Sequence, residues 1–333
     1  MKTLPDHQYF KNRIFDIATP EEFSQLALEL FRYQAQHNPV YANYLEHLGR
    51  KIDSIQLLTD IPFIPIEFFK NFELTTTRFK AQTVFISSGT SGKNTSRHWV
   101  RDVGWYQQVF KRAFEQFYGR PENYCILGLL PSYLEREGSS LIFMVEKLIE
   151  ESGDRESGFY LDEYHVLLPL IDKKLKSGKK VLLLGVTFAL LDLAEEQQLP
   201  WEELMVMETG GMKGRRKEMV RNDVHAKLQQ AFGVPQVHSE YGMTELLSQA
   251  YAKREGLFET PPWMQVMIRE TADPFTYAPL GKTGGINIID LANVDSCAFI
   301  ETQDLGRKHK DGRFEVMGRF DHADIRGCNL MVV

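Results

Sequence analysis

A loop of hydroxyl residues, glycines and one lysine has the composition of a phosphate-binding loop. It follows an apolar run at residues 81–86 that predicts a strand, and it consists of Ser87, Ser88, Gly89, Thr90, Ser91, Gly92 and Lys93. Glycines let the backbone turn its N–H groups into a concavity, and the hydroxyls and the lysine add donors and a positive charge. It is not a Walker A sequence, because Asn94 follows the lysine. The alternative interpretation is a surface turn of small residues.

Four further polar stretches follow predicted strands, and they offer groups that bind a nucleotide. They lie at residues 208–211, 238–245, 301–307 and 318–321. Tyr241, next to Gly242, could stack on a purine, with the backbone of Gly210 and Gly211 on the other side of the base. Asp304 could accept hydrogen bonds from both ribose hydroxyls, and Arg319 could reach the ribose or a phosphate.

One carboxylate of these stretches is the candidate metal ligand. Mg²⁺ takes one or two protein carboxylates together with phosphate oxygens, and Glu245 lies four residues after Tyr241. Each fragment alone is more often a simple turn. Their order along the chain is the stronger observation.

Composition limits the classes of function. The chain has 333 residues, with 39 Lys plus Arg against 45 Asp plus Glu, a formal net charge of −6 and no basic block, which argues against a nucleic-acid partner. The apolar stretch at residues 181–191 is shorter than the roughly 20 residues that span a bilayer. The first residues lack the apolar segment of a signal peptide, so we expect a cytoplasmic protein without a transmembrane segment. Three scattered cysteines, Cys125, Cys297 and Cys328, indicate neither disulfides nor a zinc site.

The pattern of apolar runs and helices between these motifs predicts an α/β fold. Near-continuous apolar strands alternate with helices up to about residue 262, which predicts a mostly parallel sheet flanked by helices, with ligands at the carboxyl ends of the strands. From about Trp263 short strands follow one another without helices, which predicts an appended antiparallel sheet or small β-barrel.

These patterns divide the chain into three parts of one compact unit. We expect an N-terminal helical segment at 1–80, an α/β nucleotide-binding body at 81–262 and a β-rich subdomain at 263–333. Thr19-Pro20-Glu21-Glu22 is a capping box that predicts a helix to about Asn38. A charged helix is expected at 214–232, and late strands at 285–289, 297–300 and 314–317.

The order of the motifs resembles the signature set of the adenylate-forming superfamily, which includes acyl-CoA synthetases, adenylation domains and luciferases. The resemblance runs from Phe85 to Leu330. Within the superfamily the chain looks like the LuxE-type acyl-protein synthetases, with phenylacetate:CoA ligases next nearest. In CoA ligases the Gly-Arg-x-Asp segment is a hinge to a mobile C-terminal lid that provides a lysine. Twelve residues follow Asp321 here, so the resemblance implies the large domain without that lid.

This resemblance implies an acid–thiol ligase that uses ATP and Mg²⁺. The carboxylate of a substrate, expected to be a fatty acid, would attack the α-phosphate, so catalysis would consist of positioning and charge neutralisation. Lys93 and Thr244 would lie beside the transferring phosphate, and Glu245 would hold the metal. The acyl pocket is expected at Gly185, Val186 and Phe188, with His238 as a lining residue.

The acyl-adenylate must then be passed on. In LuxE-type proteins the acyl group moves to a cysteine near the C-terminus, which would be Cys328 here, and from there as a thioester to an acyl reductase; a carrier protein is the other candidate acceptor. Cys328 is equally well explained as a buried structural cysteine. Two other functions stay open: a carboxylate:CoA or carrier-protein ligase whose lid is supplied in trans, and a non-catalytic subunit that binds nucleotide beside a partner enzyme.

Overall fold

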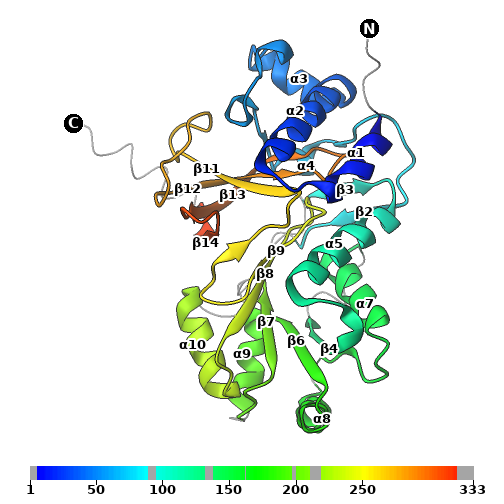
Figure 1. The fold of residues 1–333 in the computed structure, drawn as a ribbon, viewed down its shortest axis with the longest axis vertical. Coiled ribbons are helices and arrows are strands. Elements are labelled where there is room, and N and C mark those ends of the chain that lie inside the picture. Colours follow the sequence, from blue (N-terminus) through cyan, green and yellow to red (C-terminus); the bar gives the residue numbers. More distant parts are fainter. Residues whose placement is uncertain are drawn as a thin grey trace, which may run out of the picture.

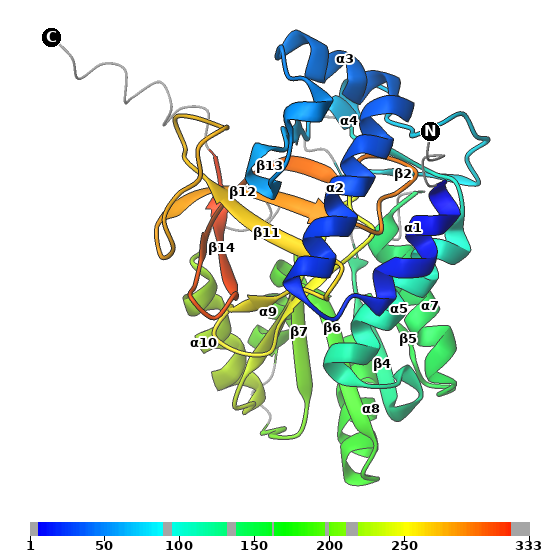
Figure 2. The same ribbon diagram turned by 45° about the horizontal axis from the view of Figure 1, so that its top comes forward.

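One mixed sheet runs through the whole molecule (Figures 1 and 2). The computed structural model describes residues 6–88, 95–131, 138–161, 163–196, 200–210 and 219–320. Twelve strands form the large sheet in the order β11-β12-β13-β14-β10-β9-β8-β7-β6-β4-β5, with β1 paired to β13, and β2 and β3 form a separate two-stranded sheet. Among the described residues, no helix combines the length and apolar character needed to cross a bilayer.

The described elements have the following bounds. The helices are α1 His7–Arg13, α2 Pro20–His37, α3 Pro39–His47, α4 Phe68–Asn71, α5 Val103–Tyr118, α7 Ser140–Ser152, α8 Tyr164–Lys176, α9 Thr187–Glu196 and α10 Arg221–Phe232. The strands up to the middle of the sheet are β1 Ile64–Pro65, β2 Thr83–Ile86, β3 Arg97–Val100, β4 Tyr124–Leu129, β5 Gly158–Phe159, β6 Lys180–Val186, β7 Met205–Thr209 and β8 Val237–Tyr241. The remaining strands are β9 Ala250–Ala252, β10 Phe258–Glu259, β11 Met264–Arg269, β12 Thr283–Asp290, β13 Phe299–Lys308 and β14 Phe314–Arg319.

The first half of the sheet is parallel, as the apolar strands predict. β4, β5, β6, β7 and β8 pair only in parallel with one another. Figure 1 shows α9 and α10 on one face of these strands and α5 and α7 on the other. Burial on both faces explains why β4 and β6 consist almost entirely of buried residues. The predicted fold class is confirmed.

The second half of the sheet is antiparallel and continues the first without a break. β9 pairs antiparallel with β8 and with β10, and β10 pairs with β14, so the expected appended sheet is joined edge to edge with the parallel strands. The late strand predicted at 297–300 is longer, since β13 extends to Lys308. Burial alternates along this strand: Thr302 is 1% exposed and Asp304 is 8% exposed, whereas the residue between them is less buried. Such alternation is the pattern of a strand and not of a turn.

The loop rich in Ser and Gly belongs to the small hairpin. β2 pairs antiparallel with β3 only, with Ile86 opposite Arg97, and β3 was not predicted. The loop therefore connects two strands of a hairpin, and does not lead from the main sheet into a helix. The charged helix predicted at 214–232 begins at Arg221; residues 211–218 lie outside the described residues.

The N-terminal segment is fastened to the late strands by buried hydrogen bonds. α2 begins with the predicted capping box at Thr19. The amide of Gln34, which is fully buried, donates to the carbonyls of Asn293, Val294 and Ser296 at 2.9, 3.1 and 3.2 Å, and its oxygen accepts from Ala298 N at 2.9 Å. β1 lies parallel to β13. The boundaries expected at 80 and 262 stay predictions.

Replacement of Gln34 by Ala should destabilise the protein strongly. It removes the side-chain partner of the Asn293 and Val294 carbonyls and of Ala298 N, whereas the Ser296 carbonyl keeps Asn38 and Thr76 as donors, at a cost of about 2–4 kcal/mol in the free energy of unfolding. Urea unfolding followed by tryptophan fluorescence measures this cost. The matched control is Gln25→Ala on the exposed side of the same helix, which should change the free energy by less than about 0.5 kcal/mol. Equal effects of both changes would contradict the anchoring role of Gln34.

Candidate functional site

Three residues from distant motifs meet in one cluster. The Tyr241 hydroxyl donates to Asp304 Oδ2 at 2.7 Å, and Arg319 Nε lies 3.4 Å from Asp304 Oδ1. Tyr241 ends β8, whereas Asp304 and Arg319 are opposite each other on β13 and β14. The Asp304 side chain is nearly buried and that of Arg319 is 82% exposed. A carboxylate is thus held at the surface end of the cluster with an accessible guanidinium beside it.

The Tyr241 ring is packed among aromatic side chains. It is 8% exposed and meets Phe258 and Phe314 edge to face, with ring centroids 5.8 and 5.9 Å away. Burial and the nearby Asp304 carboxylate raise the pKa of Tyr241 well above its usual value, so the phenol stays protonated and donates. Its role as a platform for a purine stays a prediction.

Glu245 is a buried carboxylate in the connection from β8 to β9. It is 5% exposed. Burial raises its pKa, against a hydrogen bond with Ser96 and the positive charges of Arg319 and Lys70, which lower it. Arg319 therefore acts both on Glu245 and on the Tyr241–Asp304 pair. A divalent cation is a further group that would stabilise this carboxylate.

The small hairpin and the connection from β8 to β9 are joined through a histidine. His98 on β3 is 1% exposed, and its Nδ1 donates to the carbonyl of Thr244 at 2.8 Å. Burial lowers the pKa of His98 to about 4, so the ring is neutral at pH 7. Asn293 Nδ2 donates to the carbonyl of Glu245 at 2.8 Å. The hairpin that presents the Ser/Gly loop is thus fixed against the candidate metal ligand.

Part of the predicted site lies outside the described residues. This holds for Gly89, Thr90, Ser91, Gly92 and Lys93 of the loop, for Gly211 and for Cys328. Of the loop's first residues, Ser87 N donates to Ser96 O at 3.0 Å and Ser87 Oγ accepts from Ser96 N at 2.8 Å. These bonds close the hairpin next to Ser88, and the roles expected of the loop stay predictions.

The end of β7 is held by an ion-paired glutamate to which the sequence analysis gave no role, although it lies in the predicted stretch 208–211. Glu208 is 3% exposed and accepts from Arg221 Nε at 3.0 Å, with His225 Nε2 at 3.6 Å. Burial raises its pKa, but contact with His225 and the charge of Arg221 outweigh burial, and the pKa lies below its usual value. Arg221 also donates to the carbonyl of Val316 on β14 at 2.8 Å. It thereby ties the turn at Gly210, where φ is +71°, to the strand of Arg319.

Glu240 is a second buried acid to which the sequence analysis assigned no role, and none of the described residues forms an ion pair with it. It is 7% exposed, and its one hydrogen bond among the described residues comes from the Thr209 hydroxyl. Burial raises its pKa to about 7, with a smaller contribution from the charge of Glu208. Nearby, Gln249 Oε1 and the Tyr251 hydroxyl are buried without a hydrogen-bond partner within the described ranges. A protonatable carboxyl thus adjoins Tyr241 at the carboxyl end of β8.

The residues expected at the acyl pocket are largely core. A Cβ at Gly185 would lie 2.9 Å from the Leu190 side chain, so this glycine allows close packing of α9 on β6. Val186 and Phe188 are 0% and 2% exposed. His238 is half-buried, its Nδ1 lies 3.3 Å from the Tyr118 hydroxyl, and burial lowers its pKa to about 4. A pocket role for these four residues stays a prediction.

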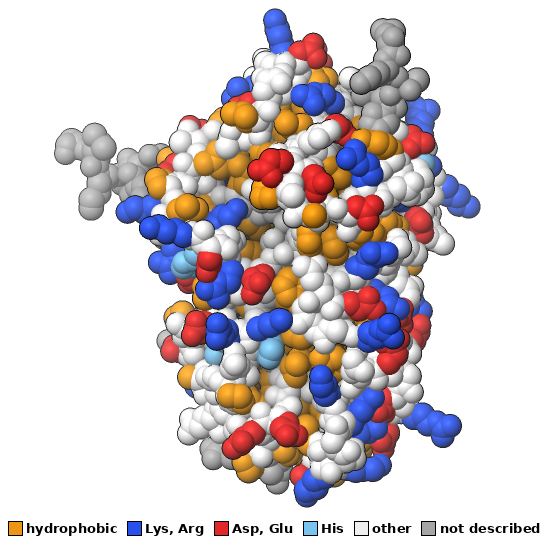
Figure 3. All heavy atoms as spheres, viewed as in Figure 1, with side chains coloured by type: hydrophobic (Ala, Val, Ile, Leu, Met, Phe, Trp, Pro, Cys, Tyr) orange, Lys and Arg blue, Asp and Glu red, His pale blue; other side chains and the backbone are white. Residues whose placement is uncertain are grey.

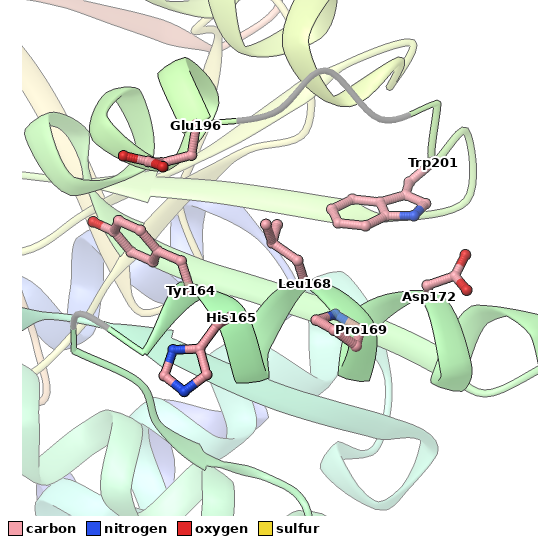
Figure 4. Close-up of a pocket in the computed structure, with 7 residues that line it drawn as sticks. All are labelled: Tyr164, His165, Leu168, Pro169, Asp172, Glu196 and Trp201. Carbon is pink, nitrogen blue, oxygen red and sulfur yellow. The ribbon is translucent and has the colours of Figure 1, made fainter.

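A groove of about 490 Å³ lies away from this cluster. Figure 4 shows it between α8, the end of α9 and the segment before β7. It is lined by Tyr164, His165, Leu168, Pro169, Asp172, Glu196 and Trp201. None of the residues predicted for the site lines it.

Charges of both signs are interspersed over the face seen in Figure 3. The described residues include no group of three His, Cys, Asp or Glu able to hold a metal by themselves.

Comparison with known proteins identifies the fold. No protein-family model matches the chain, and no curated protein matches it. Among solved structures, 2-hydroxyisobutyryl-CoA ligase in complex with 2-HIB-AMP and CoA in the thioesterification state is similar over 96% of this chain and 73% of that chain, at 14% identity and a TM-score of 0.66. The same ligase in the postadenylation state with R3-HIB-AMP matches with a TM-score of 0.64 at 13% identity, over 93% and 70% of the two chains. ATP-bound MatB from Rhodopseudomonas palustris matches with a TM-score of 0.51 at 16% identity, over 73% of this chain. The match spans 50% of the length of MatB. The chain therefore has the fold of these acid:CoA ligases.

Glu240 should make stability depend on pH. A carboxyl whose pKa is raised in the native state favours folding at pH values below its unfolded pKa, and this contribution is lost as pH rises through the native pKa. A pKa difference of one unit between the folded and unfolded states corresponds to about 1.4 kcal/mol in the free energy of unfolding. The rise of the Glu240 pKa from 4.5 to about 7 therefore corresponds to on the order of 3 kcal/mol. We expect Glu240→Gln to gain stability relative to wild type between pH 5 and pH 8, as measured by urea unfolding.

The control for this experiment is the exposed Glu259 on β10. Glu259→Gln should follow the pH dependence of wild type. If Glu240→Gln follows it as well, Glu240 titrates in the native state as an ordinary exposed carboxyl.

Proposed function

We propose that the protein activates a carboxylic acid with ATP to form an acyl-adenylate and pyrophosphate, and transfers the acyl group to a thiol. The observation that supports this most is the contact of Tyr241 with Asp304 and of Asp304 with Arg319, at 2.7 and 3.4 Å. Two segments more than sixty positions apart, which the motif order assigns to one nucleotide site, meet in one cluster. Glu245 is within range of the same Arg319 charge.

The chemistry of the cluster fits the two groups that such a reaction needs. Asp304 offers a fixed carboxylate for the ribose hydroxyls of ATP, since Tyr241 and Arg319 hold its two oxygens in place. Glu245 is a buried carboxylate whose burial disfavours the charged form, and binding of Mg²⁺ would offset this cost. The metal would neutralise phosphate charge during the reaction.

The residues of the chain would act by position and charge. The acid's own carboxylate is the nucleophile, so the protein needs no covalent step for activation. Arg319 is exposed enough to reach a phosphate or the ribose. Thr244 is held in place through its carbonyl by the neutral His98, and its hydroxyl would approach the reacting phosphate. Lys93 in the hairpin loop would add a cation. In these roles the residues would stabilise the negative charge of the reacting phosphate, because the fold holds them in position before the reaction begins.

For the second step we propose an acyl-protein synthetase. Cys328 would take the acyl group as a thioester and pass it to a partner acyl reductase or a carrier protein. Cys125 and Cys297 are both fully buried, and burial raises the pKa of each thiol, to about 12 for Cys297. Neither is suited to react as a thiolate, which leaves Cys328 as the candidate among the three cysteines.

A carboxylate:CoA ligase is the second candidate function. It is favoured by the similarity to 2-hydroxyisobutyryl-CoA ligase, whose structure contains both 2-HIB-AMP and CoA. In that case the acid would be small or polar, CoA would be the acceptor, and Cys328 would not be acylated. A partner subunit that binds nucleotide without turnover is the remaining alternative; it predicts ATP binding and no pyrophosphate exchange.

Asp304→Asn should raise the KM for ATP by about 10- to 100-fold, because a charged acceptor for the ribose is lost. The measurement is the exchange of labelled pyrophosphate into ATP in the presence of a panel of carboxylic acids. The control is Asp311→Asn in the turn between β13 and β14, which is half exposed and should leave the KM unchanged. An active enzyme with an unaltered KM after Asp304→Asn would argue against the ribose assignment.

Cys328→Ser should abolish covalent labelling by an acid that supports exchange, while the exchange itself continues. Labelling is measured by intact mass after incubation with ATP, Mg²⁺ and the acid, with and without hydroxylamine to cleave a thioester. Cys125→Ser is the matched control, although its buried position makes a stability measurement necessary. Labelling that persists in Cys328→Ser, or product that forms only with CoA, would favour the CoA ligase.

A further inference from the structure

A short helix that the motif analysis did not include is pinned against the candidate site. α4 follows β1, and β1 runs beside β13, with Ile66 N donating to Glu301 O at 2.9 Å. The carboxylate of Glu67 accepts from the side-chain amide of Gln303, the residue before Asp304. The start of α4 is thus fixed to the strand that presents the proposed ribose-binding carboxylate.

The other side of α4 is fixed to the small hairpin. Phe69 is fully buried and meets the His98 ring edge to face, with centroids 5.7 Å apart and planes at 80°. His98 in turn binds the carbonyl of Thr244. Figure 1 shows α4 next to β3, and the two elements are in contact. The helix therefore bridges β13 and the connection that contains Thr244 and Glu245.

Lys70, the next residue of this helix, is a cation without a counter-ion in the described part of the chain. It is half-buried, and no hydrogen bond or ion pair connects it to another described residue. Its positive charge acts on the buried carboxylate of Glu245, as does that of Arg319. Arg319 is paired with Asp304, whereas no carboxylate of the described residues forms an ion pair with Lys70. Buried or half-buried ammonium groups favour an anionic partner.

We propose that Lys70 is a catalytic residue of acid activation and that its ammonium binds the non-bridging oxygens of the reacting α-phosphate. This role rests on the proposed function. In the step, a carboxylate oxygen of the acid forms a bond to the α-phosphorus while the bond from phosphorus to the bridging oxygen of the β-phosphate breaks. Pyrophosphate leaves with the electron pair, and no proton moves. Negative charge on the α-phosphate oxygens in the transition state would be stabilised by the ammonium of a lysine on this anchored helix.

The experiment compares Lys70→Ala, Lys70→Arg and Lys70→Gln with wild type in the pyrophosphate exchange assay. We expect Lys70→Ala and Lys70→Gln to lower kcat by about 100-fold with a much smaller change in the KM for ATP, because the interaction strengthens in the transition state. Lys70→Arg keeps the charge and should retain more activity than Lys70→Gln. Propylammonium added to Lys70→Ala should restore part of the rate, which loss of folding alone would not allow.

Lys227→Ala on the exposed face of α10 is the control and should match wild type. Exchange in Lys70→Ala at the wild-type rate overturns the role of Lys70 and leaves the proposed function intact. Absence of exchange in wild type with every acid tested overturns the proposed function and this role together. If Lys70→Ala does not fold, as judged by circular dichroism, equal kcat values of Lys70→Gln and Lys70→Arg overturn the role.

Discussion

The candidate site depends on a buried connection without regular secondary structure. Residues 242–249 join the last parallel strand to the first antiparallel one, and their backbone polar groups need partners away from water. Asp290, which is fully buried, accepts from two backbone N–H groups and one hydroxyl of this connection at 2.6–3.0 Å. Asn293 and His98 bond to two of its carbonyls. Two other parts of the chain, the β3 strand with His98 and the segment from Asp290 to Asn293, therefore have to be in place before Glu245 reaches its position.

Three buried glutamates near the carboxyl ends of the parallel strands have different charged partners, and their pKa values differ accordingly. Glu208 lies against Arg221 and keeps its charge. Glu240 has a hydroxyl donor but no ion pair with any cation that the structure describes, and burial brings its pKa to about 7. Glu245 has cations within electrostatic range but not in direct contact, and burial still raises its pKa. Glu208 is therefore suited to a structural ion pair, and Glu245 is suited to binding a ligand that carries positive charge.

Local patterns of the sequence predicted the parts of the fold that depend on neighbouring residues. The capping box at Thr19 and the apolar runs of β4 and β6 are such parts. β13 was predicted too short because its second half has the composition of a turn, and only burial of alternate residues against β12 and β14 makes it a strand. The motif order pointed to Tyr241 and Asp304, whose contact the structure contains. Buried charges such as Glu240 went unpredicted, because a single sequence does not distinguish a buried glutamate from an exposed one.

The attachment of the N-terminal segment has a consequence for synthesis on the ribosome. The four hydrogen bonds of Gln34 join residues 259 to 264 positions apart, and β1 meets β13 across a similar interval. Helix α2 is made early, yet its buried Phe31 packs edge to face against Phe299, the first residue of β13, which is made much later. During most of translation the nascent chain therefore lacks the partners of both Gln34 and Phe31, and these contacts of high sequence separation form late in folding.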